Sequence, residues 1–214
     1  ALPVLKDIVI NLGTFFLVLT IGLTVLNGTP MAPLAIGASL MIMVYMGGHV
    51  SGGHYNPAVS LGVLLRGKLP ASDFVPYVVA QVAGALVAGF TVNAVLGKTF
   101  APAPGDGVGS LSALLVEILY TFALVLVVLN SAASDKTKGN SFYGLAIGFS
   151  LVVAAFAGGP VSGGAFNPAV GIGPTIVNAL LGGGTWAHLW LYLVGPLVGG
   201  ALAAMVFGLQ ERVA

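Results

Sequence analysis

The chain has 214 residues, of which 57% are hydrophobic and only 6% are charged. Because about a quarter of the residues in a soluble domain are usually charged, this composition indicates that lipid is the surrounding solvent. The net charge of +1 gives no electrostatic basis for a nucleic-acid partner, and the absence of cysteine excludes disulfides, thiolate metal sites and cysteine nucleophiles.

Six apolar segments are long enough to cross a membrane, which takes about 20 residues of helix. Breakers rich in glycine, proline and charge separate them. The first segment has no small-residue cleavage site, so we expect a membrane helix there and not a cleaved signal peptide. The predicted fold class is an all-α membrane protein with six transmembrane helices. In chain order these cover residues 4–26, 33–51, 72–96, 109–130, 141–159 and 187–208.

Two further apolar stretches, residues 57–65 and 168–180, are too short to span. At about 1.5 Å per residue, each reaches roughly half of a hydrocarbon core of about 30 Å. Both begin at the proline of a repeated phrase: residues 50–62 read VSGGHYNPAVSLG and residues 161–173 read VSGGAFNPAVGIG. We expect the two stretches to be re-entrant half-helices.

Weaker similarities flank the repeated phrase on both sides. They pair residues 12–19 with 119–126, and residues 77–90 with 192–205. Each half thus contains three spans and one half-helix, and an odd number of spans inverts the second half in the membrane. Inverted repeats with interrupted segments at matching positions indicate a midplane site in a transport protein. We expect one membrane channel domain over residues 1–214, with inverted repeats of approximately 1–104 and 105–214.

The loop charges predict the orientation. If both termini are cytoplasmic, the outside surfaces carry only Lys98, and this distribution satisfies the positive-inside rule. The protein is then multi-pass with both ends inside. We expect a plasma membrane, and the short loops and termini favour a bacterial inner membrane. The inside surfaces would carry Lys6, Arg66, Lys68, Lys136, Lys138 and Arg212.

The repeated Asn-Pro-Ala turn has a specific physical role. Asparagine is a preferred N-cap and proline is favoured at the first helical position, so a single copy is only an ordinary helix start. Two copies in inverted halves aim two helix N-termini at the membrane centre, each with about half a positive charge and unpaired N–H donors. Such a neck accepts the oxygen of a neutral solute and repels cations. The glycine-rich stretches 51–53 and 162–164 leave carbonyls free to line a watery cavity.

These features resemble the aquaporin, or major intrinsic protein, family over essentially the whole chain. The resemblance rests on the two Asn-Pro-Ala phrases, the form SGGHYNPAV of the first, and six spans in two inverted halves. It implies a right-handed bundle of six spanning and two half-spanning helices, a pore in each protomer and a homotetramer. It implies a passive channel in the lipid bilayer, not an enzyme, with no cofactor or metal. The pore centre would comprise Asn56, Pro57, Ala58, Asn167, Pro168 and Ala169, with loop backbone from Gly52, Gly53, His54, Ser162 and Gly163.

One feature departs from the family pattern. In most members an arginine follows the second Asn-Pro-Ala and forms an outer filter with an aromatic residue from the second span. Val170 occupies that position here, and counting from the motifs places Ile36, Ala155 and Gly164 at the other three. A filter without charge or ring should be wider and more apolar. We therefore expect passage of water and of small neutral solutes such as glycerol, urea, ammonia, hydrogen peroxide or gas, with ions excluded.

The family also has a buried glutamate early in its first and fourth spans. Glu117 matches the fourth-span position, and we expect it to brace the backbone of residues 162–164. Ile10 occupies the first-span position, with Asn11 beside it as a candidate replacement. The family analogue of His54 lines the cytoplasmic vestibule.

Other functions stay open at this point. A strict water channel is the first alternative, followed by a non-conducting scaffold or adhesion protein and by an ion-coupled secondary transporter. A transporter usually needs several intramembrane carboxylates, and an intramembrane enzyme needs paired acids or a Ser–His pair at depth. Only Glu117 lies there. A flux assay separates a channel from a scaffold, and dependence on an ion gradient identifies a transporter.

Overall fold

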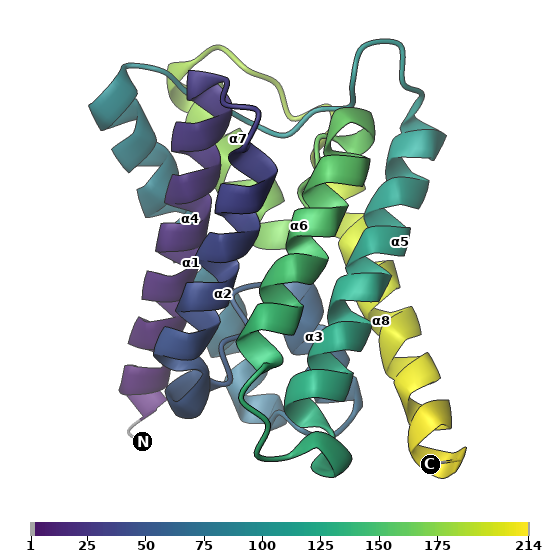
Figure 1. Ribbon diagram of the computed structural model, residues 1–214. Coiled ribbons are helices and arrows are strands. Elements are labelled where there is room, and N and C mark those ends of the chain that lie inside the picture. Colours follow the sequence, from purple (N-terminus) through teal and green to yellow (C-terminus); the bar gives the residue numbers. More distant parts are fainter. Residues whose placement is uncertain (1–2, 214) are drawn as a thin grey trace.

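The computed structural model describes residues 3–213, and within that range every regular element is a helix (Figure 1). Two short turns, η1 and η2, follow α5. The elements are α1 (Pro3–Asn27), α2 (Ala32–Ser51), α3 (Pro57–Leu65), α4 (Ala71–Leu96), α5 (Ser110–Val128), η1 (Leu129–Ala133), η2 (Asp135–Thr137), α6 (Tyr143–Ser162), α7 (Pro168–Leu181) and α8 (Leu189–Val213).

The six predicted spans are confirmed as helices long and apolar enough to cross a membrane. The boundaries differ most at two places. The span of α5 continues through the π-helical turn η1 to Ala133, and α8 runs to Val213, beyond the predicted end at residue 208. Large apolar side chains such as Val79, Leu111 and Met205 are exposed on the outside of the bundle, as a lipid environment requires.

The helices pack in a pattern that relates the two halves of the chain. In the first half α1 lies along α4, and in the second half α5 lies along α8, while α2 meets α6 across the centre. The half-helices cross over: α7 packs on α4, and α3 packs on α8. Each half-helix therefore packs chiefly on a long helix of the other half.

Both chain ends lie on one face of the bundle, at the bottom of Figure 1. We call this the terminal face; it also carries the α3–α4 loop and the α5–α6 loop with η1 and η2. The opposite face carries residues 28–31, 97–109 and 182–188. An even number of spans places both ends of the chain on the same face.

Glycines at matching positions allow the closest helix contacts. A Cβ added to Gly84 of α4 would lie 2.5 Å from the carbonyl oxygen of Asn11 in α1. A Cβ added to Gly199 of α8 would likewise lie 2.5 Å from the carbonyl oxygen of Ile118 in α5. Backbone atoms cannot turn aside as a side chain can, so these two crossings require glycine.

We predict that Gly199→Ala destabilises the protein, because the added methyl group must push α8 away from α5. Overpacking of this kind costs about 1–3 kcal/mol, which exceeds the gain of roughly 1 kcal/mol in helix propensity. Thermal unfolding in detergent measures the effect. Gly159→Ala in α6 is the matched control, since a Cβ there meets nothing within 4 Å. Equal melting temperatures for the two variants would contradict the packing argument.

Candidate functional site

The two repeated loops form the same structure twice. Asn56 and Asn167 both have extended backbone, with φ of −159° and −162°, and each caps the half-helix that follows it. The Oδ1 atom of Asn56 accepts a hydrogen bond of 2.9 Å from the Ala58 amide. Asn167 accepts the matching bond, also 2.9 Å, from the Ala169 amide. The local geometry is the N-cap that the Asn-Pro-Ala sequence predicts.

The same two asparagines also tie the loops to each other. Nδ2 of Asn56 donates to the carbonyl oxygen of Phe166 at 2.8 Å, and Nδ2 of Asn167 donates to that of Tyr55 at 2.9 Å. Tyr55 and Phe166 have φ of 42° and 48°, a left-handed conformation that costs side-chain-bearing residues about 1–3 kcal/mol. The reciprocal bonds hold the two strained carbonyls in place.

The asparagines retain donors for a solute. An amide nitrogen carries two N–H groups, and in residues 3–213 each Nδ2 has one protein acceptor. Both residues line a central cavity of about 390 Å³. The remaining N–H groups are thus available at the point where α3 and α7 meet.

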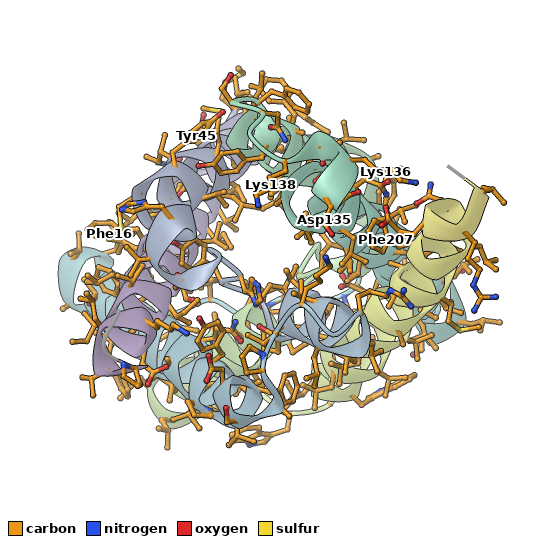
Figure 2. The ribbon with its side chains drawn as sticks, turned by 90° about the horizontal axis from the view of Figure 1, so that it is seen from below. Phe16, Tyr45, Asp135, Lys136, Lys138 and Phe207 are labelled. Atoms are coloured by element: carbon orange, nitrogen blue, oxygen red, sulfur yellow. The ribbon has the colours of Figure 1, made fainter. Side chains whose placement is uncertain are left out.

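The central cavity has almost no polar side chains on its wall. Its lining contains no charged residue, and its polar side chains are His54, Asn56 and Asn167. Leucine, isoleucine and valine from α1, α2, α5 and α6 cover the side away from the loops. Figure 2, which looks at the terminal face, shows the opening between the helices. The wall is therefore a polar strip of loop backbone facing an apolar surface.

All four residues assigned to the filter lie on this wall. Ile36, Ala155, Gly164 and Val170 come from α2, α6, the second loop and α7, and each lines the cavity. Residues 100–103, in the long loop between α4 and α5, line it as well. No pattern in the sequence predicts that this loop lies at the cavity.

A second cavity of about 540 Å³ opens on the terminal face. It is more polar, and its lining includes His49, Lys68, Asp135 and Lys138. His54 and Val128 line both cavities. They therefore mark the junction between the central cavity and this vestibule.

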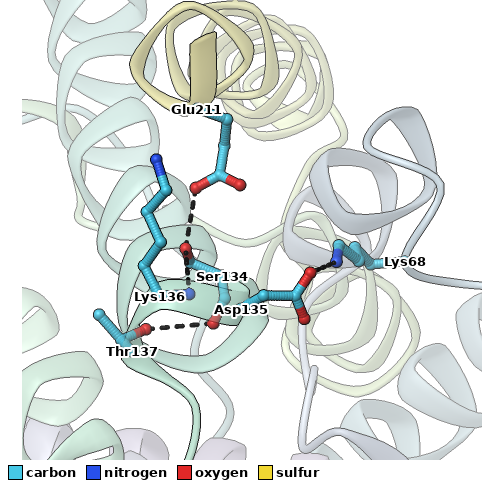
Figure 3. A network of polar contacts seen from close by, with 6 residues as sticks. All are labelled: Lys68, Ser134, Asp135, Lys136, Thr137 and Glu211. Carbon is cyan, nitrogen blue, oxygen red and sulfur yellow. Dashed lines mark hydrogen bonds and ion pairs between the residues drawn. The ribbon is translucent and has the colours of Figure 1, made fainter. Parts of the chain in front are cut away.

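Polar contacts link three segments around the vestibule (Figure 3). Lys68 of the α3–α4 loop pairs with Asp135 at 3.0 Å, and Ser134 donates to Glu211 of α8 at 2.8 Å. The hydrogen bond and positive charge of Lys68 lower the pKa of the exposed Asp135 carboxyl. Because this pair lies in water, salt screens it, and it orders the rim only weakly.

A buried carboxylate braces the second loop, as the sequence predicted, although its contacts lie slightly further along the chain. Glu117 is fully buried, and its oxygens accept from the Ser162 hydroxyl at 2.7 Å, the Ala165 amide at 3.0 Å and the Phe166 amide at 2.7 Å. All three neighbours are donors, which suits an ionised carboxylate. Gly164 donates to the Ser162 hydroxyl and does not reach Glu117.

The first loop has no such carboxylate. Ile10 is fully buried at the matching position, and Asn11 does not brace the loop, because its Nδ2 donates to the carbonyl oxygen of Ala80 at 3.1 Å. The ring of Tyr55 fills the space against Gly13, and its hydroxyl donates to the Met43 carbonyl at 2.8 Å. The second half has the matching aromatic residue, Phe166, which is also fully buried, so the ring is common to both halves and the carboxylate belongs to the second half alone.

A pair of tyrosines supports both loops in the same way. The Tyr77 hydroxyl donates to the carbonyl oxygen of Ser51 at 2.8 Å, and the Tyr192 hydroxyl donates to that of Ser162 at 2.5 Å. Sequence reasoning missed both residues. The signal was present, because they are the first residues of the similar stretches 77–90 and 192–205.

The predicted loop backbone divides between the two cavities. Gly53, His54 and Gly163 line the central cavity, whereas Gly52 lines the vestibule. The side chain of Ser162 is fully buried and bonded to Glu117, so it points away from the path. Gly164, next in the chain, reaches the cavity.

These observations define a class of protein: an all-helical membrane bundle in which two half-helices meet around an uncharged central cavity. The family model for the major intrinsic proteins matches residues 8–207. The chain therefore belongs to the major intrinsic protein family, whose members are passive channels and not enzymes.

Individual relatives agree with this assignment. The chain is 38% identical to a glycerol uptake facilitator protein-like 6 from Lactiplantibacillus plantarum, covering 90% of this chain and 92% of that protein. It is 33% identical to aquaporin NIP1-1 of Zea mays, covering 98% of this chain and 76% of that one. The fold matches the aquaglyceroporin of Plasmodium falciparum with a TM-score of 0.85 at 22% identity, over 96% and 95% of the two chains.

We predict that Glu117→Gln destabilises the protein and reduces flux. The substituted amide keeps one acceptor oxygen but presents N–H donors to a backbone N–H, and an unmade buried hydrogen bond costs about 1–3 kcal/mol. Thermal unfolding in detergent and water flux in proteoliposomes measure the two effects. Asp106→Asn, an exposed acid in the loop between α4 and α5, is the control. If both variants melt like the parent protein, Glu117 does not brace the loop.

Proposed function

We propose that this protein is a passive channel that conducts water and small neutral solutes, glycerol among them, and excludes ions. The observation that supports it most is the wall of the central cavity, which has no charged side chain and only three polar ones along its whole length. The volume of about 390 Å³ falls in the range of roughly 300–1,000 Å³ typical of small-molecule sites.

The shape of the wall supports solutes with one polar and one apolar edge. The two asparagine N–H donors and the free carbonyls of the loops lie along one side, while Leu40 and Leu151 belong to the opposite, apolar side. A polyol or an amide can bond to the polar strip and still contact the apolar surface. Water can bond to the polar strip, but it makes no favourable contact with the apolar surface.

Cation exclusion follows from the half-helices. Both helix N-termini point at the cavity centre, where Asn56 and Asn167 cap them. Each end carries about half a positive charge, and no acidic side chain on the wall offsets it. A cation entering this region loses hydration water and meets a positive potential.

The filter assignment belongs to this proposal. Ile36, Ala155, Gly164 and Val170 would form the outer constriction, with no guanidinium to narrow it. We also propose that the terminal face is cytoplasmic, because it carries Lys68, Lys136 and Lys138, and that the protein assembles as a homotetramer in a plasma membrane. The relative named as a glycerol uptake facilitator favours glycerol passage over the alternative of a strict water channel.

We predict that Val170→Arg restricts the channel to water. The long cationic side chain would cross a cavity that valine only lines, and glycerol flux should fall by about tenfold, equivalent to roughly 1.4 kcal/mol of barrier. Stopped-flow light scattering on proteoliposomes measures water and glycerol flux in the same preparation.

The uncharged variant Val170→Met is the matched control, because it adds length without charge. Glycerol flux should fall less in this variant than in Val170→Arg. If the parent protein conducts water but no glycerol, the wide-filter proposal fails. If Val170→Arg conducts glycerol like the parent, Val170 is not at the filter.

A further inference from the structure

A buried chain of three polar side chains ends at the junction of the two cavities. Nδ1 of His54 lies 3.1 Å from the Ser60 hydroxyl oxygen, and Nε2 of Gln81 donates to that oxygen at 3.0 Å. Ser60 and Gln81 are fully buried, and His54 is nearly so. These contacts run from the first loop through α3 to α4; His54 lines both cavities, whereas Ser60 and Gln81 line neither.

The second half of the protein has no counterpart of these three hydrogen-bonded side chains. The internal repeat aligns Ala165 with His54, Gly171 with Ser60 and Pro196 with Gln81. None of these residues has a polar side chain. Packing of the half-helix therefore does not require a histidine, a serine and a glutamine, since the other half packs without them. Their presence on one side only indicates a role in the path itself.

The hydrogens of this chain can be assigned from its contacts. Because Gln81 donates to the Ser60 oxygen, the serine hydrogen needs another acceptor, and in residues 3–213 the one within bonding distance is Nδ1 of His54. Nδ1 must then be unprotonated, so the neutral ring carries its hydrogen on Nε2. Within residues 3–213 that atom has no protein partner, and it is not among the buried unpaired atoms, so it faces the cavity.

The position of this hydrogen matters in a water-filled channel. Histidine is the residue best suited to relay protons near neutral pH, and His54 lies where the central cavity meets the vestibule. A ring with a free Nε2 lone pair could accept a proton from channel water. A ring with Nε2–H outward and Nδ1 bonded to Ser60 presents no free lone pair. In that form the neutral ring can only donate a hydrogen bond from Nε2–H to molecules in the path.

We propose that Ser60 and Gln81 are positioning residues that hold His54 in its Nε2–H form and so prevent its ring from relaying protons through the channel. This inference rests on the proposed channel function. A competing arrangement turns the Gln81 amide over, so that its oxygen accepts the serine hydrogen and Nδ1 carries the proton. That arrangement leaves both N–H groups of Gln81 without an acceptor, whereas the first arrangement leaves one N–H group and the oxygen Oε1 unpaired.

Nitrogen-15 NMR distinguishes the two arrangements directly, because protonated and unprotonated ring nitrogens have well-separated shifts. The chain has three histidines, so a His49→Gln/His188→Gln background leaves His54 as the single signal. We expect a protonated Nε2 and an unprotonated Nδ1. In Ser60→Ala the tautomer ratio should shift toward Nδ1–H by about fivefold, the factor that corresponds to loss of one ordinary hydrogen bond.

Flux measurements test the consequence. Proton leak in proteoliposomes should rise by about the same fivefold in Ser60→Ala, with water flux nearly unchanged. Thr121→Val is the matched control, because it also removes a fully buried hydroxyl. Within residues 3–213 that hydroxyl has no hydrogen-bond partner, so it is not part of the His54–Ser60–Gln81 contacts. Gln81→Leu provides a second variant if Ser60→Ala loses water flux through misfolding.

Two results would overturn the inference. One is a protonated Nδ1 in the parent protein. The other is an unchanged spectrum and an unchanged proton leak in whichever of the two variants retains water flux. An absence of water flux in the parent would instead contradict the proposed function. The spectrum would still report the tautomer of His54.

Discussion

The structure depends on two hydrogen bonds that cross between its halves. Asn56 donates to the backbone of the second loop and Asn167 donates to the backbone of the first. These bonds hold two left-handed carbonyls, at Tyr55 and Phe166, and they fix the point where α3 and α7 meet end to end. Because each half-helix also packs on a long helix of the opposite half, neither half can form the path alone. The cavity is a product of the joined halves.

The halves share a backbone but stabilise their loops with different side chains. Tyrosine hydroxyls at matching positions support both loops. Beyond these, the second loop is braced by the buried carboxylate of Glu117, whereas the first half has the apolar side chain of Ile10 at the matching position. The buried carboxyl group of Glu117 thus lies on one side of the central neck only. The His54, Ser60 and Gln81 side chains lie on the other side, so the electrostatics of the path are less symmetric than its fold.

Much of this could be predicted from the sequence, because the strongest signals are local or repeated. The six spans follow from hydropathy, and the paired caps follow from the chemistry of Asn-Pro at a helix start. The positions of Ile36 and Val170 on the cavity wall follow from the filter positions of the family that the sequence resembles, counted from a fixed motif. The failures have a common physical cause. The contacts that were missed join segments far apart in the sequence. Asn11 donates to a backbone carbonyl of α4, and the Ser60–Gln81 contact depends on how α3 crosses α4. Residues 100–103 reach the cavity through an irregular loop, which has no periodicity to read.

The central claim is that this path admits neutral molecules and excludes ions. The most direct measurement is electrical conductance across planar bilayers containing the protein, with water flux determined on the same preparation. The positive helix ends oppose sodium, and loss of hydration on a largely apolar wall opposes chloride. The account therefore predicts water flux with no sodium or chloride current above that of protein-free bilayers. An ionic current that increases with the amount of protein would contradict the account.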